Sequence, residues 1–317
     1  MYDVPFFPSE DSKLRATSLN IRRGGNCPNS LQVLEQLLSE HDTLQLHLVS
    51  PLPATASSAT QRVISSFGAQ SNIDFSHWVY REESTEAASS YIMRSEASGS
   101  RTLVNYSDLL EMTEDEFGNI ARGFNPDQET WWHFEGRIPD TIQSCIRLLR
   151  NVLPKATISV EIEKPGREGL PELAAEADVV FYSRSWAESR GHNTPEQCLR
   201  AEGHQKACMA VADKKLHRSL ALCTWGEDGA AGLSRSTGES IHCPALDKSG
   251  RDISVIDAVG AGDTFIAGML YGLICHPDDW SMGKKLGFAV RLATLKVQRE
   301  GFDGLGRDML GTEIGGV

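Results

Sequence analysis

The stretch Asp257–Thr264 places two glycines and a carboxylate directly before an apolar segment, Phe265–Ile274. Gly260 and Gly262 permit a tight turn, and the residues after them are expected to form a helix. The free N–H groups and the positive dipole end at the start of a helix favour an anion such as a phosphate. Asp263 has two interpretations: a helix cap, or a general base that takes a proton from an attacking hydroxyl during phosphoryl transfer.

A second polar constellation lies far upstream, where a Gly-Gly pair ending at Gly25 precedes Asn26 and Asn29. Glycine lets the backbone approach a ligand closely, and each amide side chain offers a donor and an acceptor to sugar hydroxyls. The alternative is a turn in which Asn29, or the serine after it, caps a helix over Leu31–Leu38.

Both stretches resemble signatures of the PfkB, or ribokinase-like, carbohydrate kinases. Asp257–Thr264 resembles the C-terminal D-T-x-G-A-G-D signature, with Ala258 in place of the usual threonine, and Arg23–Ser30 resembles the N-terminal G-G-N-x-x-N signature. The stretches that resemble the ketohexose-phosphorylating branch of this family are Glu96–Thr102, His133–Arg137, Ser159–Pro165 and Gly301–Gly304. Together these matches span about residues 10 to 305, while residues 38–86 match poorly.

The resemblance implies ATP-dependent phosphorylation of a sugar hydroxyl, with a ketohexose such as fructose as acceptor and ATP and Mg²⁺ as cofactors. It implies that Asp263 is the catalytic base, and that the acceptor contacts Gly25, Asn26, Asn29 and Asp263. The residues that it implies for nucleotide binding are Arg101, Gly226, Glu227, Asp228, Gly229, Gly260, Ala261 and Gly262. Many members of the family carry an N-x-x-E motif that organises magnesium-bound water; here the sequence has Ser183–Trp186, so the metal ligands stay unassigned.

The elements that must position these residues alternate in type after Trp131. Strand and helix patterns follow one another, which predicts a parallel sheet with helices on both faces. The expected segments are Trp131–Phe134, Thr141–Leu153, Thr157–Ile162, Leu170–Ala175, Val179–Ser183, Leu220–Thr224 and Ser281–Lys296. A glycine turn at Gly226–Gly229 follows one of these strands, and ligands of this fold class sit at the carboxyl ends of strands. In this sheet Trp131 and Trp132 are expected in the core and not as a stacking platform.

The expected fold class is α/β, a ribokinase-like three-layer α/β/α sandwich with a mostly parallel sheet and a small β-strand lid. We expect a single domain over residues 1–317, with lid segments near 12–24 and 88–107. Ser89–Ser95 and Arg101–Tyr106 are typical of a hairpin, which we assign to that lid. Leu44, Leu46 and Leu48 alternate with polar residues, which predicts a further strand. The glycine-containing end, Arg307–Val317, is typical of a loose tail.

Met1–Asp11 shows no strand period, and the resemblance implies a further buried strand that would precede Met1 and end in a sugar-binding aspartate. Asp3 matches a position beyond that aspartate. Either the sequence is truncated or the sugar site has lost a part, and we favour truncation. Without the aspartate we expect weaker sugar binding with nucleotide binding preserved.

Composition limits the partners. A formal charge of −12 argues against nucleic acid and against an anionic membrane surface. Seven irregularly spaced cysteines and no signal sequence indicate reduced thiols in a soluble, cytoplasmic protein. The resemblance further implies a homodimer formed through the lid.

Two rival functions remain open: a weakly active or inactive nucleotide-binding descendant, and a kinase for another sugar or a nucleoside.

Overall fold

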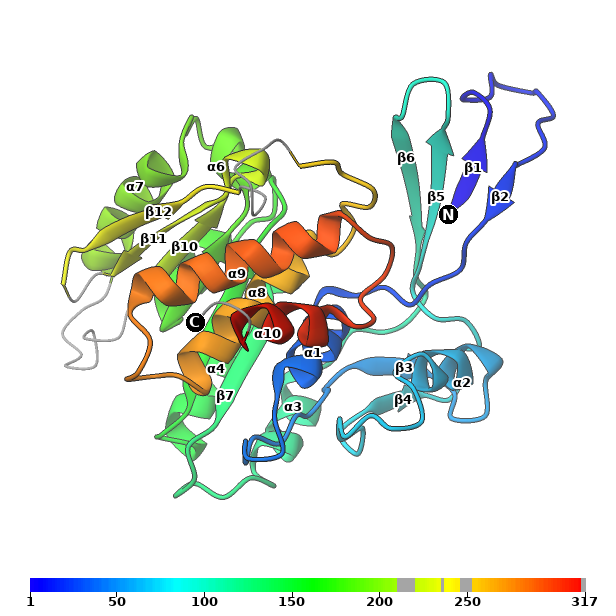
Figure 1. Ribbon diagram of the computed structural model, residues 1–317. Coiled ribbons are helices and arrows are strands. Elements are labelled where there is room, and N and C mark those ends of the chain that lie inside the picture. Colours follow the sequence, from blue (N-terminus) through cyan, green and yellow to red (C-terminus); the bar gives the residue numbers. More distant parts are fainter. Residues whose placement is uncertain (210–219, 235–236, 246–252, 315–317) are drawn as a thin grey trace. The chain divides into compact units, whose positions relative to one another are not determined.

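A computed structural model describes residues 1–209, 220–234, 237–245 and 253–314 (Figure 1). The chain divides into two compact units. The first comprises Met1–Gly25 and Gln45–Met112, and the second comprises Asn26–Leu44 and Thr113–Val317. The interpretation of the chain as a single domain stays a prediction.

The first unit holds a four-stranded sheet in the order β2-β1-β5-β6 and a separate parallel pair, β3-β4. Its elements are β1 (Tyr2–Val4), β2 (Ser18–Leu19), β3 (Pro51–Pro53), α2 (Ser58–Ser65), β4 (Val79–Arg81), β5 (Ser89–Ser95) and β6 (Arg101–Tyr106). The predicted hairpin is confirmed with both of its bounds, and its register pairs Ser89 with Tyr106 and Arg94 with Arg101.

Three expectations for the first unit need correction. Met1–Asp11 was expected to lack a strand, yet β1 pairs in parallel with β5, where Asp3 accepts hydrogen bonds from Arg94 and Ser18. Of the segment near 12–24 only the two residues of β2 form a strand. Leu46 and Leu48 are buried as their alternation predicts, but that segment forms one β-bridge, between His47 and Asp74, and no strand.

The second unit holds a six-stranded sheet in the order β12-β11-β10-β9-β8-β7. Strands β7 to β10 are parallel to one another, and β11 and β12 extend the sheet antiparallel. The strands are β7 (Trp131–Glu135), β8 (Thr157–Ile162), β9 (Val179–Tyr182), β10 (Leu220–Thr224), β11 (Ala230–Ser234) and β12 (Ser240–Cys243). Strands β8 and β10 have the bounds that the sequence predicted.

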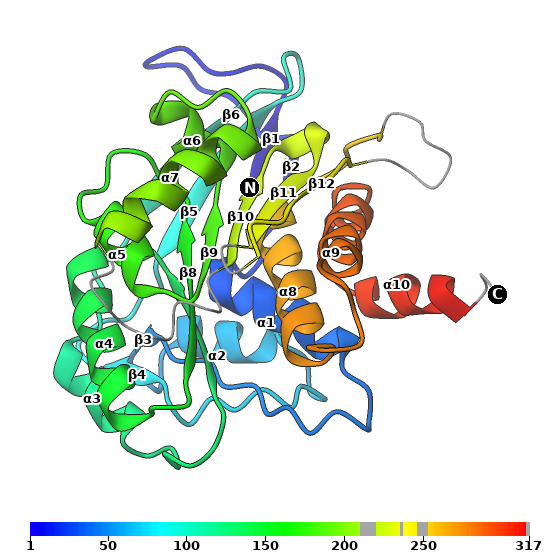
Figure 2. The ribbon, with the colours of Figure 1, turned by 90° about the vertical axis from the view of Figure 1, so that its left-hand side faces the viewer.

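Helices cover both faces of this sheet, as Figure 2 shows: α4 to α7 lie on one face and α1, α8 and α9 on the other. The helices are α1 (Asn26–Leu37), α3 (Glu114–Ala121), α4 (Pro139–Val152), α5 (Leu170–Glu176), α6 (Arg184–Ser189), α7 (Pro195–Met209), α8 (Ala261–Ile274), α9 (Met282–Val297) and α10 (Leu305–Ile314), with the short 3₁₀ helix η2 (Gly226–Asp228). The expected α/β/α sandwich is therefore confirmed.

The core of the second unit lies between the sheet and its helices. Apolar side chains of the parallel strands, such as Ile158, Val160 and Leu222, are fully buried, as expected for strands covered on both faces. Trp132 is buried against Phe117 and Phe124, which confirms its core position, whereas Trp131 is half-buried.

The expected loose tail is corrected over residues 307–314, which belong to the helix α10; residues 315–317 lie outside the described ranges. Leu305 and Met309, four residues apart, are fully buried, and α10 packs against α1 and α9. A Cβ at Gly306 would collide with the backbone of Gln36 in α1. The absence of a side chain at Gly306 therefore permits α10 and α1 to approach closely.

As the cysteine spacing predicted, free thiols are found at Cys27, Cys145, Cys198, Cys223, Cys243 and Cys275. Among the described residues, no helix is both long and apolar enough to cross a membrane.

Candidate functional site: a glycine turn and buried carboxylates

The glycine turn before α8 has the geometry that an anion site requires. Gly260 is the N-cap residue with φ of 80°, a left-handed conformation in which a Cβ would also collide with the ring of Phe302. The helix begins at Ala261, and no heavy atom lies within 4 Å of where a Cβ of Gly262 would stand. The first-turn backbone of α8 can therefore approach a phosphate oxygen.

A buried ion pair fixes the segment that leads into this turn. Lys296 is fully buried in α9, and its Nζ donates to the carbonyl oxygen of Asp257 at 3.1 Å and to its Oδ2 at 3.2 Å. Asp257 Oδ1 in turn accepts the N–H of Val259 at 3.0 Å. The N–H groups of Ile256 and Asp257 donate to the carbonyl of Val297 at the end of α9. The turn is therefore anchored on one side by α9.

Asp263 lies in the first turn of α8, three residues beyond the N-cap Gly260, and only 7% of it is exposed. Its Oδ2 accepts a hydrogen bond from Asn29 Nδ2 at 2.7 Å, and its carbonyl oxygen accepts one from Ser30 Oγ at 3.0 Å. The two polar stretches selected from the sequence therefore meet in the structure. The interpretation of Asp263 as the N-cap of this helix is wrong, because Gly260 occupies that position.

The start of α1 also corrects the alternative drawn for the upstream stretch. The helix begins at Asn26 and not at Leu31, so Asn29 and Ser30 lie inside it and are not its caps. Both are buried on the side of α1 that faces Asp263, and α1 packs against α8. Gly25, with φ of 98°, stands immediately before the helix.

Carboxylates gather at the ends of β7 and β8 beside Asp263. Asn26 Nδ2 donates to Glu161 Oε2 at 2.9 Å and to Glu163 Oε2 at 3.2 Å. The pKa of Glu161 is raised to about 8, chiefly by burial; repulsion from Asp263, Glu163 and Glu135 contributes to the rise, and the hydrogen bond from Asn26 opposes it. Burial likewise raises the pKa of Glu135. Glu161 is therefore largely protonated at neutral pH.

The second predicted glycine turn follows β10 as η2. The N–H of Trp225 donates to the carbonyl of Gly229 at 2.7 Å, and a Cβ at Gly229, whose φ is 86°, would collide with the backbone of Cys243 and Pro244. Arg184, at the start of α6, places its guanidinium 5.4 Å from the ring centre of Trp225. Glu227 and Asp228 raise the pKa of Arg184, after the larger effect of Glu188. A cation therefore lies beside the predicted nucleotide turn.

The two glycine turns are associated with the same edge of the sheet. Strands β7 to β10 are parallel, so Glu135, Glu163, Ser183 and Trp225, each at or just after a strand end, lie at one common edge. Asp263 is close enough to Glu161 to raise the pKa of that group. The start of α8 therefore lies near this edge as well.

The predicted nucleotide contact Arg101 belongs to the first unit. It is exposed at the start of β6, opposite Arg94. Its approach to a nucleotide stays a prediction.

Sequence reasoning missed three residues that the geometry brings to the site. Lys296 stands in a helical pattern without a motif, so nothing in the sequence distinguishes it from a surface lysine. Glu161 lies in a stretch that was selected from the sequence only because it resembles the family. A glutamate inside a strand of buried residues is nevertheless a signal for a carboxyl group with a shifted pKa. Arg184 stands out only as part of the segment that replaces a magnesium motif.

A curated relative resembles this chain over nearly its whole length. The curated ketohexokinase of Mus musculus is 28% identical over 312 residues, which cover 95% of this chain and 93% of the relative. This similarity confirms the expected likeness to the ketohexose-phosphorylating branch.

Solved structures share the fold. The ribokinase of Giardia lamblia superposes with a TM-score of 0.75 at 15% identity, covering 99% of this chain and 94% of its own. The ribokinase of Arabidopsis thaliana, solved with ribose and ATP, gives a TM-score of 0.72 at 17% identity, with 98% and 93% covered. The profile of the pfkB family carbohydrate kinases matches residues 1–304. The chain therefore belongs to the pfkB family of carbohydrate kinases.

Proposed function

We propose that this carbohydrate kinase transfers the γ-phosphoryl group of ATP to a hydroxyl of a ketohexose such as fructose. The observation that carries the proposal is the bond between Asn29 and Asp263, because it joins the upstream stretch suited to sugar hydroxyls to the turn suited to phosphate. The family supports sugar phosphorylation, and the curated ketohexokinase supports a ketohexose as acceptor.

In the proposed reaction, Asp263 accepts the proton of the sugar hydroxyl while the oxygen of that hydroxyl forms a bond to the γ-phosphorus and the bond to ADP breaks. Asn29 fixes the orientation of the carboxylate through its 2.7 Å bond. The amides of Gly260, Ala261 and Gly262 stabilise the negative charge of the transferred group at the start of α8. Gly25, Asn26 and Asn29 bind the sugar.

The turn Gly226–Gly229 binds the nucleotide, with Glu227 and Asp228 at its tip and Arg101 as electrostatic support for the phosphates. The ATP in the Arabidopsis ribokinase complex supports ATP as the donor in this fold. Mg²⁺ would neutralise the phosphates, to which it commonly binds together with one or two carboxylates. The carboxylates at this edge suit such an ion chemically, and we assign none of them as its ligand.

The exposed four-stranded sheet supports the proposed homodimer. Every residue of β6 is exposed, including Leu103, Val104 and Tyr106, and so is Tyr91 of β5. An apolar sheet surface of this kind suits a second copy of the chain. Light scattering of the purified protein tests the dimer, and a monomeric mass at micromolar concentration contradicts it.

We further propose that the protein is cytoplasmic.

A phosphoryl-transfer assay tests the proposed function. ADP release is measured with fructose, other ketoses, aldoses and nucleosides, for the parent protein and for Asp263→Asn. We expect fructose to be the preferred acceptor and turnover of Asp263→Asn to fall by roughly 10²–10⁴-fold, because the amide cannot accept a proton. The control is the ATP affinity of the variant, which should stay nearly unchanged. ATP binding without turnover on any acceptor contradicts the proposal, and turnover of Asp263→Asn within a few-fold of the parent removes Asp263 as the base.

A further inference from the structure

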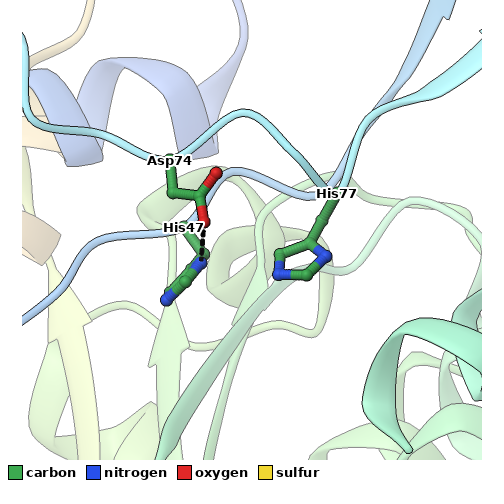
Figure 3. A group of neighbouring side chains, drawn as sticks. All are labelled: His47, Asp74 and His77. Carbon is green, nitrogen blue, oxygen red and sulfur yellow. Dashed lines mark ion pairs between the residues drawn. The ribbon is translucent and has the colours of Figure 1, made fainter. Parts of the chain in front are cut away.

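Three potential metal ligands converge in the first unit, in the part of the sequence, residues 38–86, that carries none of the family signatures. They are His47, Asp74 and His77, and one ligand atom from each lies within 4.8 Å of the others (Figure 3). His47 Nδ1 and Asp74 Oδ2 are 3.2 Å apart. All three residues are half-buried.

The backbone fixes the first two ligands opposite each other. His47 and Asp74 form a parallel β-bridge, in which the N–H of Asp74 donates to the carbonyl of Leu46 at 2.8 Å and the N–H of Leu48 donates to the carbonyl of Asp74 at 3.0 Å. Asp74 Oδ1 accepts the N–H of Ser76 at 2.7 Å. The backbone therefore holds Oδ1 of Asp74, while Oδ2 faces His47. Carboxylates that bind metals are commonly oriented by a hydrogen bond of this kind.

His77, the third ligand, lies where the parallel pairing of these two segments is interrupted. Parallel pairing resumes at the bond from the N–H of Val79 to the carbonyl of Ser50 and continues into β3 and β4. Between Asp74 and Val79 the chain turns, closed by the bond from the N–H of Trp78 to the carbonyl of Phe75. This turn sets the ring of His77 beside that of His47, with ring centres 5.3 Å apart, as Figure 3 shows.

Aromatic packing supports the turn. Phe75 packs against Phe67 with ring centres 5.0 Å apart and against Trp78 at 4.4 Å. Phe67 and Trp78 are buried. A turn held by buried aromatic rings presents its ligands with little loss of conformational freedom, which favours binding.

We propose that His47, Asp74 and His77 bind one divalent transition-metal ion of the zinc type. Two imidazoles and one carboxylate suit zinc and its neighbours, whereas magnesium and calcium prefer ligand sets made only of oxygen. Zinc ligands lie about 2.0–2.2 Å from the metal, so neighbouring ligand atoms of a tetrahedral site are about 3.4 Å apart. The pair of His47 and Asp74 has this spacing, and rotation of the His77 side chain closes the remaining distance.

The proposed ion is separate from the magnesium that accompanies ATP. The ion would link the segment before β3 to the segment before β4. The chain between these two segments, which contains α2, would then form a loop closed by the metal. Three protein ligands leave a coordination position for water.

Calorimetric titration of the chelator-treated full chain with Zn²⁺ tests the site, and the absorption spectrum of Co²⁺ reports its ligands. We expect one Zn²⁺ per chain, with a rise in the unfolding temperature because the ion binds the folded state. His77→Ala should weaken binding at least about tenfold, since loss of a residue that only hydrogen-bonds to a metal ligand already costs about 10–100-fold. Circular dichroism checks folding, and His77→Gln replaces His77→Ala if that variant does not fold.

The matched control is His41→Ala, which removes an exposed histidine of the second unit. This variant should bind Zn²⁺ as the parent does. The proposal is overturned if the parent binds no Zn²⁺ below millimolar concentration, if the His77 variant binds with the affinity of the parent, or if Mg²⁺ binds as tightly as Zn²⁺.

Discussion

Replacement of Glu161 by glutamine should remove a large part of the pH dependence of stability. The folded protein raises the pKa of Glu161 from its ordinary value of 4.5 to about 8, chiefly through burial. Between these two values the folded state binds a proton that the unfolded state has lost, so stability falls as pH rises. The fall begins near the unfolded pKa and is complete above the folded one. Glu161→Gln keeps the size of the side chain and an oxygen that can accept the bond from Asn26.

The difference between the folded and unfolded pKa values of Glu161 sets how much stability is lost as pH rises. At about 1.4 kcal/mol per pH unit, it corresponds to about 5 kcal/mol of stability lost by pH 8.5. At pH 5 the parent and Glu161→Gln should have similar stability, and at pH 8.5 the variant should be the more stable. In a chain of this size the difference corresponds to roughly 10 °C in unfolding temperature.

Thermal unfolding followed by tryptophan fluorescence, at half-unit steps from pH 5 to pH 8.5, measures this difference. The control is Glu172→Gln, which neutralises an exposed glutamate of α5 and should follow the parent at every pH. Curves of the parent and Glu161→Gln that stay parallel over the whole range would refute the reasoning.

Three further substitutions test the positioning of the site. Lys296→Met leaves Asp257 buried without its cation and should cost about 3–5 kcal/mol in the free energy of unfolding; a loss below about 1 kcal/mol contradicts the anchoring role. Gly260→Ala places a Cβ against Phe302 in a left-handed conformation and should weaken ATP binding at least several-fold by calorimetry, so an unchanged affinity contradicts the proposed anion site. Arg184→Gln should raise the KM for ATP with little change in kcat; equal KM values for variant and parent would remove Arg184 from the nucleotide site.

The sequence predicted best those elements whose hydrophobic pattern and turn residues agree. Strand β8 alternates polar and apolar residues, strand β10 is mostly apolar, and the hairpin of β5 and β6 surrounds a serine- and glycine-containing connector. The meeting of Asn29 and Asp263 followed from two motifs in the right order, although more than two hundred residues separate them. At these positions the local sequence pattern favours the same structure as the contacts between distant segments.

The errors arose where tertiary contacts decide between local alternatives. Asn26 to Ser30 contains a proline and two asparagines that suggest a turn, yet Asn26 starts a helix because Asn29 and Ser30 find partners on α8. The glycines within residues 307–317 suggested a loose tail, yet the buried Leu305 and Met309 hold this segment as a helix. At Leu46 and Leu48 the alternation of burial was right, but the partner segment turns away after Asp74, so only a bridge forms. Such partners are distant in sequence and leave no local signal.

The raised pKa of Glu161 bears directly on how Asp263 acts as a base in the proposed reaction. Asp263, Glu163 and Glu135 all lie close enough to Glu161 to raise its pKa, and a phosphate donor would add further negative charge at the same edge. Charges packed this densely in a buried site cannot all be ionised, because like charges separate the pKa values of neighbouring groups. With a pKa of about 8, Glu161 is the group that retains its proton at neutral pH. A neutral Glu161 withdraws one negative charge from the surroundings of Asp263 and of the incoming phosphates. Asn26, which donates to Glu161 Oε2 and Glu163 Oε2, therefore bridges to a neutral carboxyl group at Glu161 and not to a second full charge. The charge withdrawn at Glu161 reduces the repulsion on the carboxylate that the proposed mechanism needs at Asp263.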